Sequence, residues 1–240
     1  MEADLQIKAL LFDVFGTVVD WRSSIAREVE RALGADHPEI NGYEFADAWR
    51  AKYQPAMERV RKGEREWVKL DELHRDNLLE VLTDYKVAGM DAGQIDDLNF
   101  AWHRLSPWPD SVTGLTRLKS KFIIGTLSNG NIALIVKMAK NAGLPWDVVL
   151  GAEVARAYKP TPESYLRSAA ALSLKPEQCM LVAAHNSDLL AASKTGFKTA
   201  FVVRPTEYGP SQDFDIEAEH DYDYIAADFL DLADQLECVK

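Results

Sequence analysis

The sequence contains only two cysteines, Cys179 and Cys238, and their spacing is not that of a metal site. Two distant thiols do not build a disulfide framework, so we expect a cytoplasmic protein. The sequence has no apolar run of the roughly 18–20 residues that a membrane span requires, and its first residues, MEADLQIK, have no signal-type apolar core. We therefore expect no membrane association.

Basic residues are also in the minority, with 27 lysines and arginines against 38 acidic residues and a net charge of −11. This charge argues against nucleic acid and acidic membranes as partners. A small anionic substrate stays compatible with it, because the local field in a cleft matters more than net charge.

The segment 7–22 reads IKALLFDVFGTVVDWR, and its apolar run ends at Asp13 shortly before a Gly16-Thr17 turn. This pattern predicts a buried parallel strand over 7–14 that carries a carboxylate to the C-terminal edge of a sheet, where open α/β folds bind their ligands. We therefore interpret Asp13 as a nucleophile.

Helical periodicity dominates the chain from Trp21 to about Arg104, whereas strands and helices alternate after residue 109. Alternation predicts a parallel sheet with right-handed crossovers. We expect an α/β fold with a Rossmann-like, three-layer core formed by 1–21 and 106–240, and an inserted all-helical cap at 22–105. Cap helices are expected at 24–33, 43–61, 68–82 and 91–102. Core strands are expected at 122–127, 148–150, 180–183, 199–203 and 224–226, core helices at 111–119, 131–142, 161–172, 188–194 and 229–236, and an acidic surface loop at 205–223.

Polar groups follow several of the predicted strands. Besides Asp13 these are the pair Ser128-Asn129, then Lys159 in a loop, and His185 with Asp188 after the strand 180–183. Each of them alone is an ordinary turn, cap or surface residue. Parallel strands end at one edge of the sheet, so we expect all of these groups to meet there.

Together, Phe12-Asp13-Val14-Phe15-Gly16-Thr17, Ser128-Asn129, Tyr158-Lys159-Pro160 and Asp188 resemble the motifs of the haloacid dehalogenase superfamily over nearly the whole chain. Phosphatases of that superfamily carry an aspartate two residues after the nucleophile and another four residues before the position of Asp188. This sequence has Phe15 and Ala184 there, which leaves few oxygen ligands for Mg²⁺. The chain is therefore similar to the branch that uses no metal or other cofactor, the type II L-2-haloacid dehalogenases, and a homodimer is implied by that resemblance.

The resemblance implies displacement of halide from the α-carbon of a small 2-haloacid, a carboxylic-acid substrate, through an ester on Asp13. Lys159 would keep Asp13 ionised. Thr17, Ser128 and Asn129 would hold the substrate carboxylate, aided by the N-terminus of the helix 131–142. The cap residue Arg50 would receive the halide. The candidate apolar walls are Phe15, Trp21, Trp49 and Trp108.

Hydrolysis of the ester needs a base that activates water. Asp188 matches the family position for this role, and Tyr165 matches a family tyrosine near the nucleophile. Ala183 and His185 replace the usual Ser and Asn just before Asp188. A neutral His185 with its tautomer fixed by Asp188 is therefore an alternative base.

Three alternatives remain open at this stage. The same nucleophile could open the ring of L-azetidine-2-carboxylate, in which an amine is the leaving group. The chain could also be a binding protein without catalysis, or a Mg²⁺-dependent phosphatase of small molecules. The sequence does not define the leaving group, or the size and stereochemistry of the substrate.

Overall fold

The apolar run before Asp13 forms β1 (Ala9–Phe12), a central strand of the core. All four of its residues are buried, and they alternate between two hydrophobic clusters, as the twofold period of a strand requires. The computed structural model describes residues 6–239 and contains a parallel six-stranded sheet in the order β5-β4-β1-β6-β7-β8. The other strands are β4 (Ile123–Ser128), β5 (Val148–Gly151), β6 (Cys179–Ala183), β7 (Lys198–Val202) and β8 (Tyr224–Ala226).

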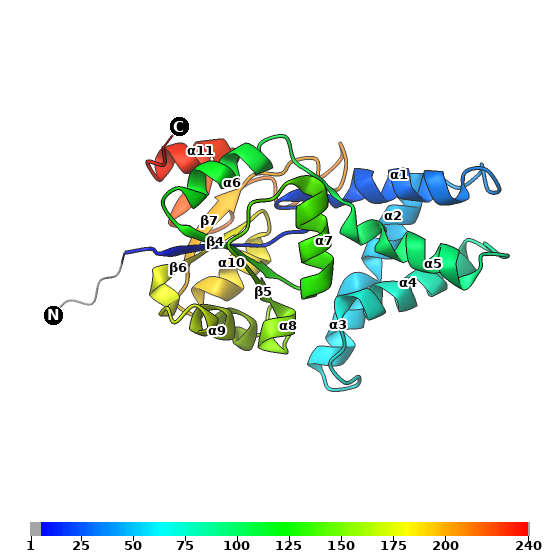
Figure 1. The fold of residues 1–240 in the computed structure, drawn as a ribbon, viewed down its shortest axis with the longest axis horizontal. Helices are drawn as coiled ribbons and strands as arrows, with labels where there is room; N and C mark the ends of the chain where they lie inside the picture. Colours follow the sequence, from blue (N-terminus) through cyan, green and yellow to red (C-terminus); the bar gives the residue numbers. More distant parts are fainter. Residues whose placement is uncertain (1–5, 240) are drawn as a thin grey trace.

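Helices cover both faces of this sheet (Figure 1). One hydrophobic cluster joins the sheet to α6, α7 and α11, and the second joins it to α9 and α10. The bounds of these helices are Ser111–Lys119 for α6, Ile132–Ala142 for α7, Ala152–Ala155 for α8, Pro162–Ala171 for α9, Asn186–Ser193 for α10 and Phe229–Gln235 for α11. The predicted three-layer α/β core is confirmed.

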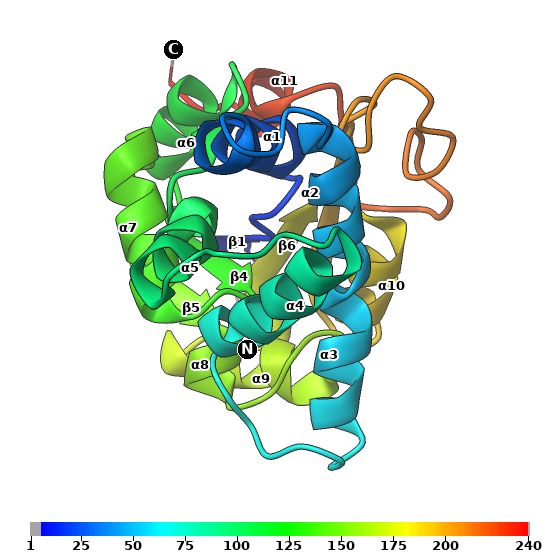
Figure 2. The ribbon, with the colours of Figure 1, turned by 90° about the vertical axis from the view of Figure 1, so that its right-hand side faces the viewer.

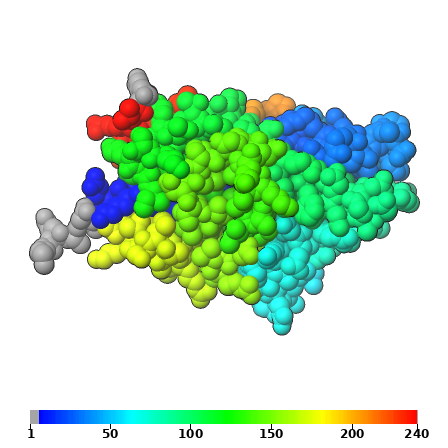
Figure 3. All heavy atoms as spheres, viewed as in Figure 1, coloured from blue at the N-terminus to red at the C-terminus, as the bar shows by residue number. Residues whose placement is uncertain are grey.

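The second part of the chain is helical and lies beyond the C-terminal edge of the sheet (Figures 1 and 2). It contains α1 (Trp21–Leu33), α2 (Gly42–Ala51), α3 (Tyr53–Arg61), α4 (Leu70–Asp84), α5 (Ala92–Asn99) and the 3₁₀ turn η1 (Phe100–His103). Figure 3 shows these helices against the green helix α7, which packs on η1. The inserted helical cap is thus confirmed as part of the fold.

A short antiparallel ribbon joins the two parts. It pairs β2 (Val19–Asp20) with β3 (Ser106–Pro107), so the chain enters and leaves the cap at neighbouring points. The sequence analysis missed this ribbon. It lies just outside the cap boundaries that we propose, residues 22 and 105.

The expected single helix over 43–61 is wrong, because the structure breaks it at Lys52 into α2 and α3. Pro55 explains the break: it has no N–H to donate to the carbonyl of Ala51, and its ring disfavours a continuous helix. The predicted cap residue Asp91 is confirmed, since its carboxylate accepts the backbone N–H of Gln94 at 2.9 Å. Among residues 6–239, no helix combines the length and apolarity needed to cross a bilayer.

Candidate active site

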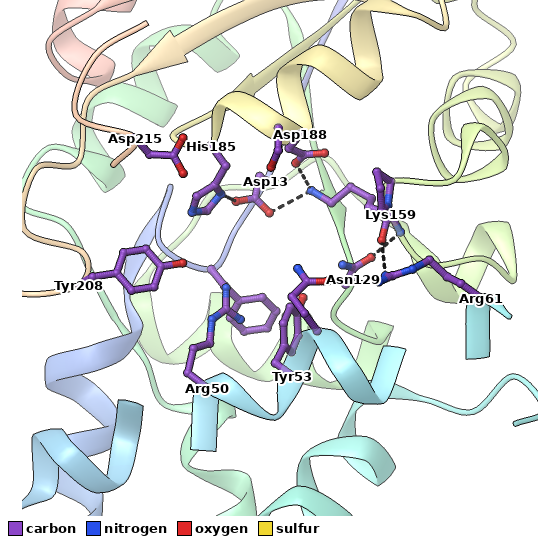
Figure 4. Close-up of a pocket in the computed structure, with 14 residues that line it drawn as sticks. Asp13, Arg50, Tyr53, Arg61, Asn129, Lys159, His185, Asp188, Tyr208 and Asp215 are labelled. Carbon is purple, nitrogen blue, oxygen red and sulfur yellow. Dashed lines mark hydrogen bonds and ion pairs between the residues drawn. The ribbon is translucent and has the colours of Figure 1, made fainter. Parts of the chain in front are cut away.

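Asp13 follows β1 directly and lines a cavity between the sheet and the cap (Figure 4). Its side chain is buried and accepts hydrogen bonds on both oxygens. Oδ1 accepts from Lys159 Nζ at 3.0 Å, whereas Oδ2 accepts from Thr17 Oγ1 at 2.8 Å and lies 3.1 Å from His185 Nδ1. Burial raises the pKa of Asp13, but Lys159 and His185 lower it by more. The pKa of this carboxyl group therefore lies well below its usual value.

Lys159 lies in the loop before α9 and bridges two carboxylates (Figure 4). Its ammonium group contacts Asp13 Oδ1 and Asp188 Oδ2, and Asp188 Oδ1 accepts from Tyr165 at 2.6 Å. Burial lowers the pKa of Lys159, but the two aspartates raise it by more, so the net pKa lies above its usual value. The structure therefore brings Asp13, Lys159, Asp188 and Tyr165 together, as the sequence analysis expected.

His185 lies between Asp13 and a carboxylate that the sequence analysis did not single out. Its Nδ1 is 3.1 Å from Asp13 Oδ2, and its Nε2 is 2.9 Å from Glu207 Oε2. An ionised carboxylate only accepts hydrogen bonds, so this arrangement favours a ring with a proton on both nitrogens. Burial lowers the pKa of His185, but Glu207 and Asp13 raise it by more, to well above 6.5. The expectation that Asp188 orients this ring is wrong, because its hydrogen-bond partners are Asp13 and Glu207.

Glu207 was missed because it belongs to the segment 205–223, which we expected to be a surface loop. That expectation is wrong for Glu207, which is 1% exposed, and for Tyr208, which lines the cavity. One feature of the sequence could have indicated that this segment reaches the site. The segment follows β7, so it leaves the sheet at the same edge as Asp13.

The residues expected to hold the substrate carboxylate are only partly available. Thr17 Oγ1 donates to Asp13 and accepts the N–H of Ala184 at 2.9 Å, so its hydroxyl is already used. Ser128 is fully buried, and its Oγ accepts the N–H of Gly130 at 3.0 Å. Asn129 does line the cavity, and its Oδ1 accepts the backbone N–H of Lys159 at 2.8 Å.

The N-terminus of α7 was also expected to face the substrate anion. The amide of Ile132, its first residue, instead donates to Glu153 Oε2 at 2.7 Å. A carboxylate of the chain itself therefore occupies this end of the helix, which leaves Asn129 as the better candidate for contacting the substrate.

The cavity has a volume of about 450 Å³ and is lined from both parts of the chain. Arg50 reaches it from α2, with its guanidinium 4.1 Å from the ring centre of Tyr53 and 5.3 Å from that of Trp21. Its Nη1 is buried and has no hydrogen-bond partner among the described residues. Burial lowers the pKa of Arg50, but nearby groups, Tyr208 first, raise it by more, so Arg50 is a cation. The lining residues are Asp13, Phe15, Arg50, Tyr53, Gln54, Arg61, Asn129, Lys159, Pro160, His185, Ser187, Asp188, Tyr208 and Asp215.

Two of the expected aromatic walls differ in their positions. Phe15 lines the cavity, and its ring lies 5.8 Å from Trp102 and 6.4 Å from Tyr53. Trp21 lies behind this wall and donates from Nε1 to Glu207 Oε1 at 2.9 Å. Trp21 therefore contributes to the site through Glu207, whereas Phe15 faces the substrate space directly.

The expectation of a metal-free site depends on which side chains surround Asp13. In the described part of the chain, no three His, Cys, Asp or Glu side chains are grouped so that they could hold a metal ion. Asp13 and Asp188 are bridged by the ammonium of Lys159, and Phe15 presents an aromatic ring where a phosphatase has a carboxylate. That the site works without metal stays a prediction.

Comparisons with known proteins agree with this geometry. The profile of the haloacid dehalogenase-like hydrolases matches residues 7–196. The solved structure of a defluorinating L-2-haloacid dehalogenase, Rha0230, is 51% identical and has a TM-score of 0.95, covering 96% of this chain and 95% of that chain. The L-2-haloacid dehalogenase from Xanthobacter autotrophicus, solved with chloropropionic acid covalently bound, is 25% identical with a TM-score of 0.80, over 97% of this chain and 99% of that chain. The (S)-2-haloacid dehalogenase 4A of Burkholderia cepacia is 29% identical over 84% of this chain and 87% of that protein. The chain belongs to the haloacid dehalogenase-like hydrolases, in the branch of the L-2-haloacid dehalogenases.

Proposed function

We propose that this protein hydrolyses short L-2-haloacids to 2-hydroxyacids through a covalent ester on Asp13, without a metal ion. The observation that carries the proposal is an ionised, buried carboxylate that lines the cavity, held by Lys159 beside an aromatic wall at Phe15. The names of the similar proteins and the covalent adduct in the Xanthobacter structure support it.

In the first step Asp13 Oδ1 attacks the α-carbon. Oδ1 has one donor, Lys159, whereas Oδ2 has Thr17 and His185, so Oδ1 retains more electron density for the attack. Fixing a nucleophile against its target in the correct geometry contributes about 7–11 kcal/mol at best. The C–halogen bond breaks as the new C–O bond forms, and halide departs with the electron pair.

Arg50 is our candidate for the halide site. Its buried Nη1 has a free N–H direction, and the aromatic rings of Tyr53 and Trp21 screen the guanidinium from water. Charge-assisted hydrogen bonds of this kind are stronger than neutral ones. Asn129 is our candidate for the substrate carboxylate.

In the second step water attacks Asp13 Cγ, and Asp188 accepts a proton from that water. Asp188 accepts from Lys159 and Tyr165, but an ionised carboxylate has about four acceptor positions and can accept a water as well. His185 has both nitrogens bound to carboxylates, which leaves Asp188 as the base.

Isotope labelling tests the covalent step. A single turnover of 2-chloropropionate in ¹⁸O-water should place the label on Asp13, because the product takes its oxygen from the enzyme. The variant Asp13→Asn should release no halide, once deamidation is excluded by mass spectrometry. Label found mainly in the first-turnover product would rule out the ester.

A substrate panel separates the leaving groups. We expect halide release from 2-chloropropionate, and parallel assays with fluoroacetate, L-azetidine-2-carboxylate and a phosphate monoester with Mg²⁺ define the range. Ring opening is not favoured, because an amine leaving group needs a proton and neither nitrogen of His185 has a free N–H to supply it. The similar proteins do not favour a phosphatase or a binding protein without catalysis.

The resemblance also leads us to propose a cytoplasmic homodimer. Size-exclusion chromatography with light scattering should give twice the mass of the chain. A monomer across the micromolar range would contradict this.

A further inference from the structure

Glu207 is a buried carboxylate with a defined partner on each oxygen. Its Oε1 accepts from Trp21 Nε1 at 2.9 Å, and its Oε2 lies 2.9 Å from His185 Nε2. The side chain is 1% exposed although it belongs to a loop. Buried charges persist in folded proteins when they are paired and hydrogen-bonded. The loop after β7 positions the Glu207 carboxylate so that it meets both conditions.

The turn that carries the nucleophile is shaped to receive the same carboxylate. Gly16 has a positive φ of 88°, and a Cβ added there would lie 2.0 Å from Glu207 Oε1. A glycine at this position therefore gives the turn its conformation and also leaves the space that the carboxylate fills. Glu207 thus contacts the Asp13 turn, His185 and Trp21, the first residue of α1.

The arrangement of Glu207 and His185 directs a ring nitrogen of His185 at Asp13 Oδ2. This oxygen accepts Thr17 Oγ1 at 2.8 Å and His185 Nδ1 at 3.1 Å, opposite the oxygen that Lys159 holds. Once Oδ1 carries the alkyl group, Oδ2 is the ester carbonyl oxygen. Attack of water on Cγ turns this carbonyl oxygen into an oxyanion, and two donors already point at it.

We propose that Glu207 is a positioning residue that holds His185 as an imidazolium, and that His185 and Thr17 together stabilise the oxyanion on Asp13 Oδ2 during ester hydrolysis. This inference depends on the proposed function, because it concerns the second step of that reaction. It assigns His185 the role of a hydrogen-bond donor and not of a base.

The step balances as follows. Water forms a bond to Asp13 Cγ and gives one proton to Asp188, while the carbonyl electron pair moves to Oδ2. The tetrahedral intermediate then collapses, the bond from Cγ to Oδ1 breaks, and the alkoxide leaves with the proton from Asp188 as the 2-hydroxyacid. Asp13 regains its carboxylate with one oxygen from water, and its remaining proton passes to solvent.

Glu207 matters most in the ester stage. The titratable groups facing His185 are Asp13 from the β1 turn and Glu207 and Tyr208 from the loop after β7. Asp215 from the same loop also lies near the ring (Figure 4), but its Oδ1 accepts from Asn186. Alkylation removes the negative charge of Asp13, so Glu207 is then the carboxylate in hydrogen-bond contact with His185 that favours the protonated ring. Without Glu207, no hydrogen-bonded carboxylate opposes the effect of burial, which lowers the pKa of His185, so the ring loses its proton more readily as pH rises.

The test uses Glu207→Gln, which keeps the side chain's shape and removes its charge. Glu217→Gln, at an exposed position of the same loop, is the matched control. Rapid-quench single turnovers of 2-chloropropionate from pH 6 to 8.5 measure halide release and ester decay separately, the ester being followed as added mass on the Asp13 peptide. In Glu207→Gln we expect ester decay to slow by about 10-fold or more as pH rises, up to the roughly 10²–10³-fold that complete loss of an oxyanion donor costs. Halide release should change less than about threefold.

His185→Leu, which leaves Glu207 in place, keeps the proposal testable if Glu207→Gln folds poorly, and a double variant tests the titration of the ring. His185→Leu removes the donor, so the ester should accumulate at every pH. His185→Asn with Glu207→Gln supplies a donor that does not titrate, so the decline at alkaline pH should disappear. Wild-type pH dependence in Glu207→Gln, or normal ester decay in His185→Leu, would overturn the inference. Absence of halide release from the wild-type protein would instead defeat the proposed function.

Discussion

Replacing Lys159 with methionine removes the cation that holds the nucleophile and keeps a side chain of similar length. The ammonium of Lys159 lies 3.0 Å from Asp13 Oδ1 and also contacts Asp188, and the residue is 6% exposed. At an effective dielectric constant of about 20, the attraction at this separation is about 5 kcal/mol. Breaking a buried ion pair by removing one partner typically costs about 3–5 kcal/mol, which agrees with this value.

We expect at least half of this attraction to hold the carboxylate in line with the C–halogen bond. Each 1.4 kcal/mol is about tenfold in rate, so the variant should release halide about 10²–10³-fold more slowly. The pH dependence should change as well. Burial is the largest influence on the pKa of Asp13 and raises it, whereas Lys159 is the first of the groups that lower it. Without Lys159 the pKa rises, so the ionised fraction of Asp13 falls at a higher pH than in the wild type.

Stopped-flow halide release between pH 4 and 9 measures both effects. Lys194→Met, an exposed substitution at the end of α10, controls for loss of one positive charge. We expect the acid limb of Lys159→Met to lie at higher pH than that of the wild type and of the control. An unshifted acid limb together with a rate within tenfold of wild type would refute the role assigned to Lys159.

Three further predictions concern stability. Thr17→Val leaves the buried N–H of Ala184 without its acceptor and should lower the free energy of unfolding by about 1–3 kcal/mol in urea titrations, with Thr17→Ser restoring most of it. Burial lowers the pKa of His74 to about 3, so its unfolded state binds more protons below pH 6.5 and stability is lost as pH falls. His74→Phe should remove about 2 kcal/mol of the loss between pH 6.5 and 4.5, and an unchanged slope in denaturation would contradict this. Phe15→Asp should cost about 3–5 kcal/mol in thermal melts, because it empties an aromatic contact, and should create no Mg²⁺-dependent phosphatase activity.

The core elements and most of the site could be predicted from the sequence, because they depend on local patterns. Parallel strands end at one edge, so Asp13, Lys159 and Asp188 were expected together, and the structure places them within hydrogen-bond contact. The strand 224–226 and the helix 111–119 follow their apolar patterns to the residue.

What could not be predicted depends on contacts between distant parts of the chain. Glu207 lies in a loop without periodicity, and its partner Trp21 is 186 residues away in sequence. His185 contacts two carboxylates that no local pattern in the sequence brings together. The break before Pro55 was available in the sequence, but the apolar periodicity on both sides of it dominated the prediction.

The central place of β1 has a consequence for biosynthesis. This strand leaves the ribosome first among those of the sheet, yet its neighbours β4 and β6 begin only at Ile123 and Cys179. Its fully buried residues have no sheet to join until the whole cap and the following strands have been translated. A nascent chain that pauses within the cap therefore exposes an apolar strand with two open edges, a state that favours aggregation.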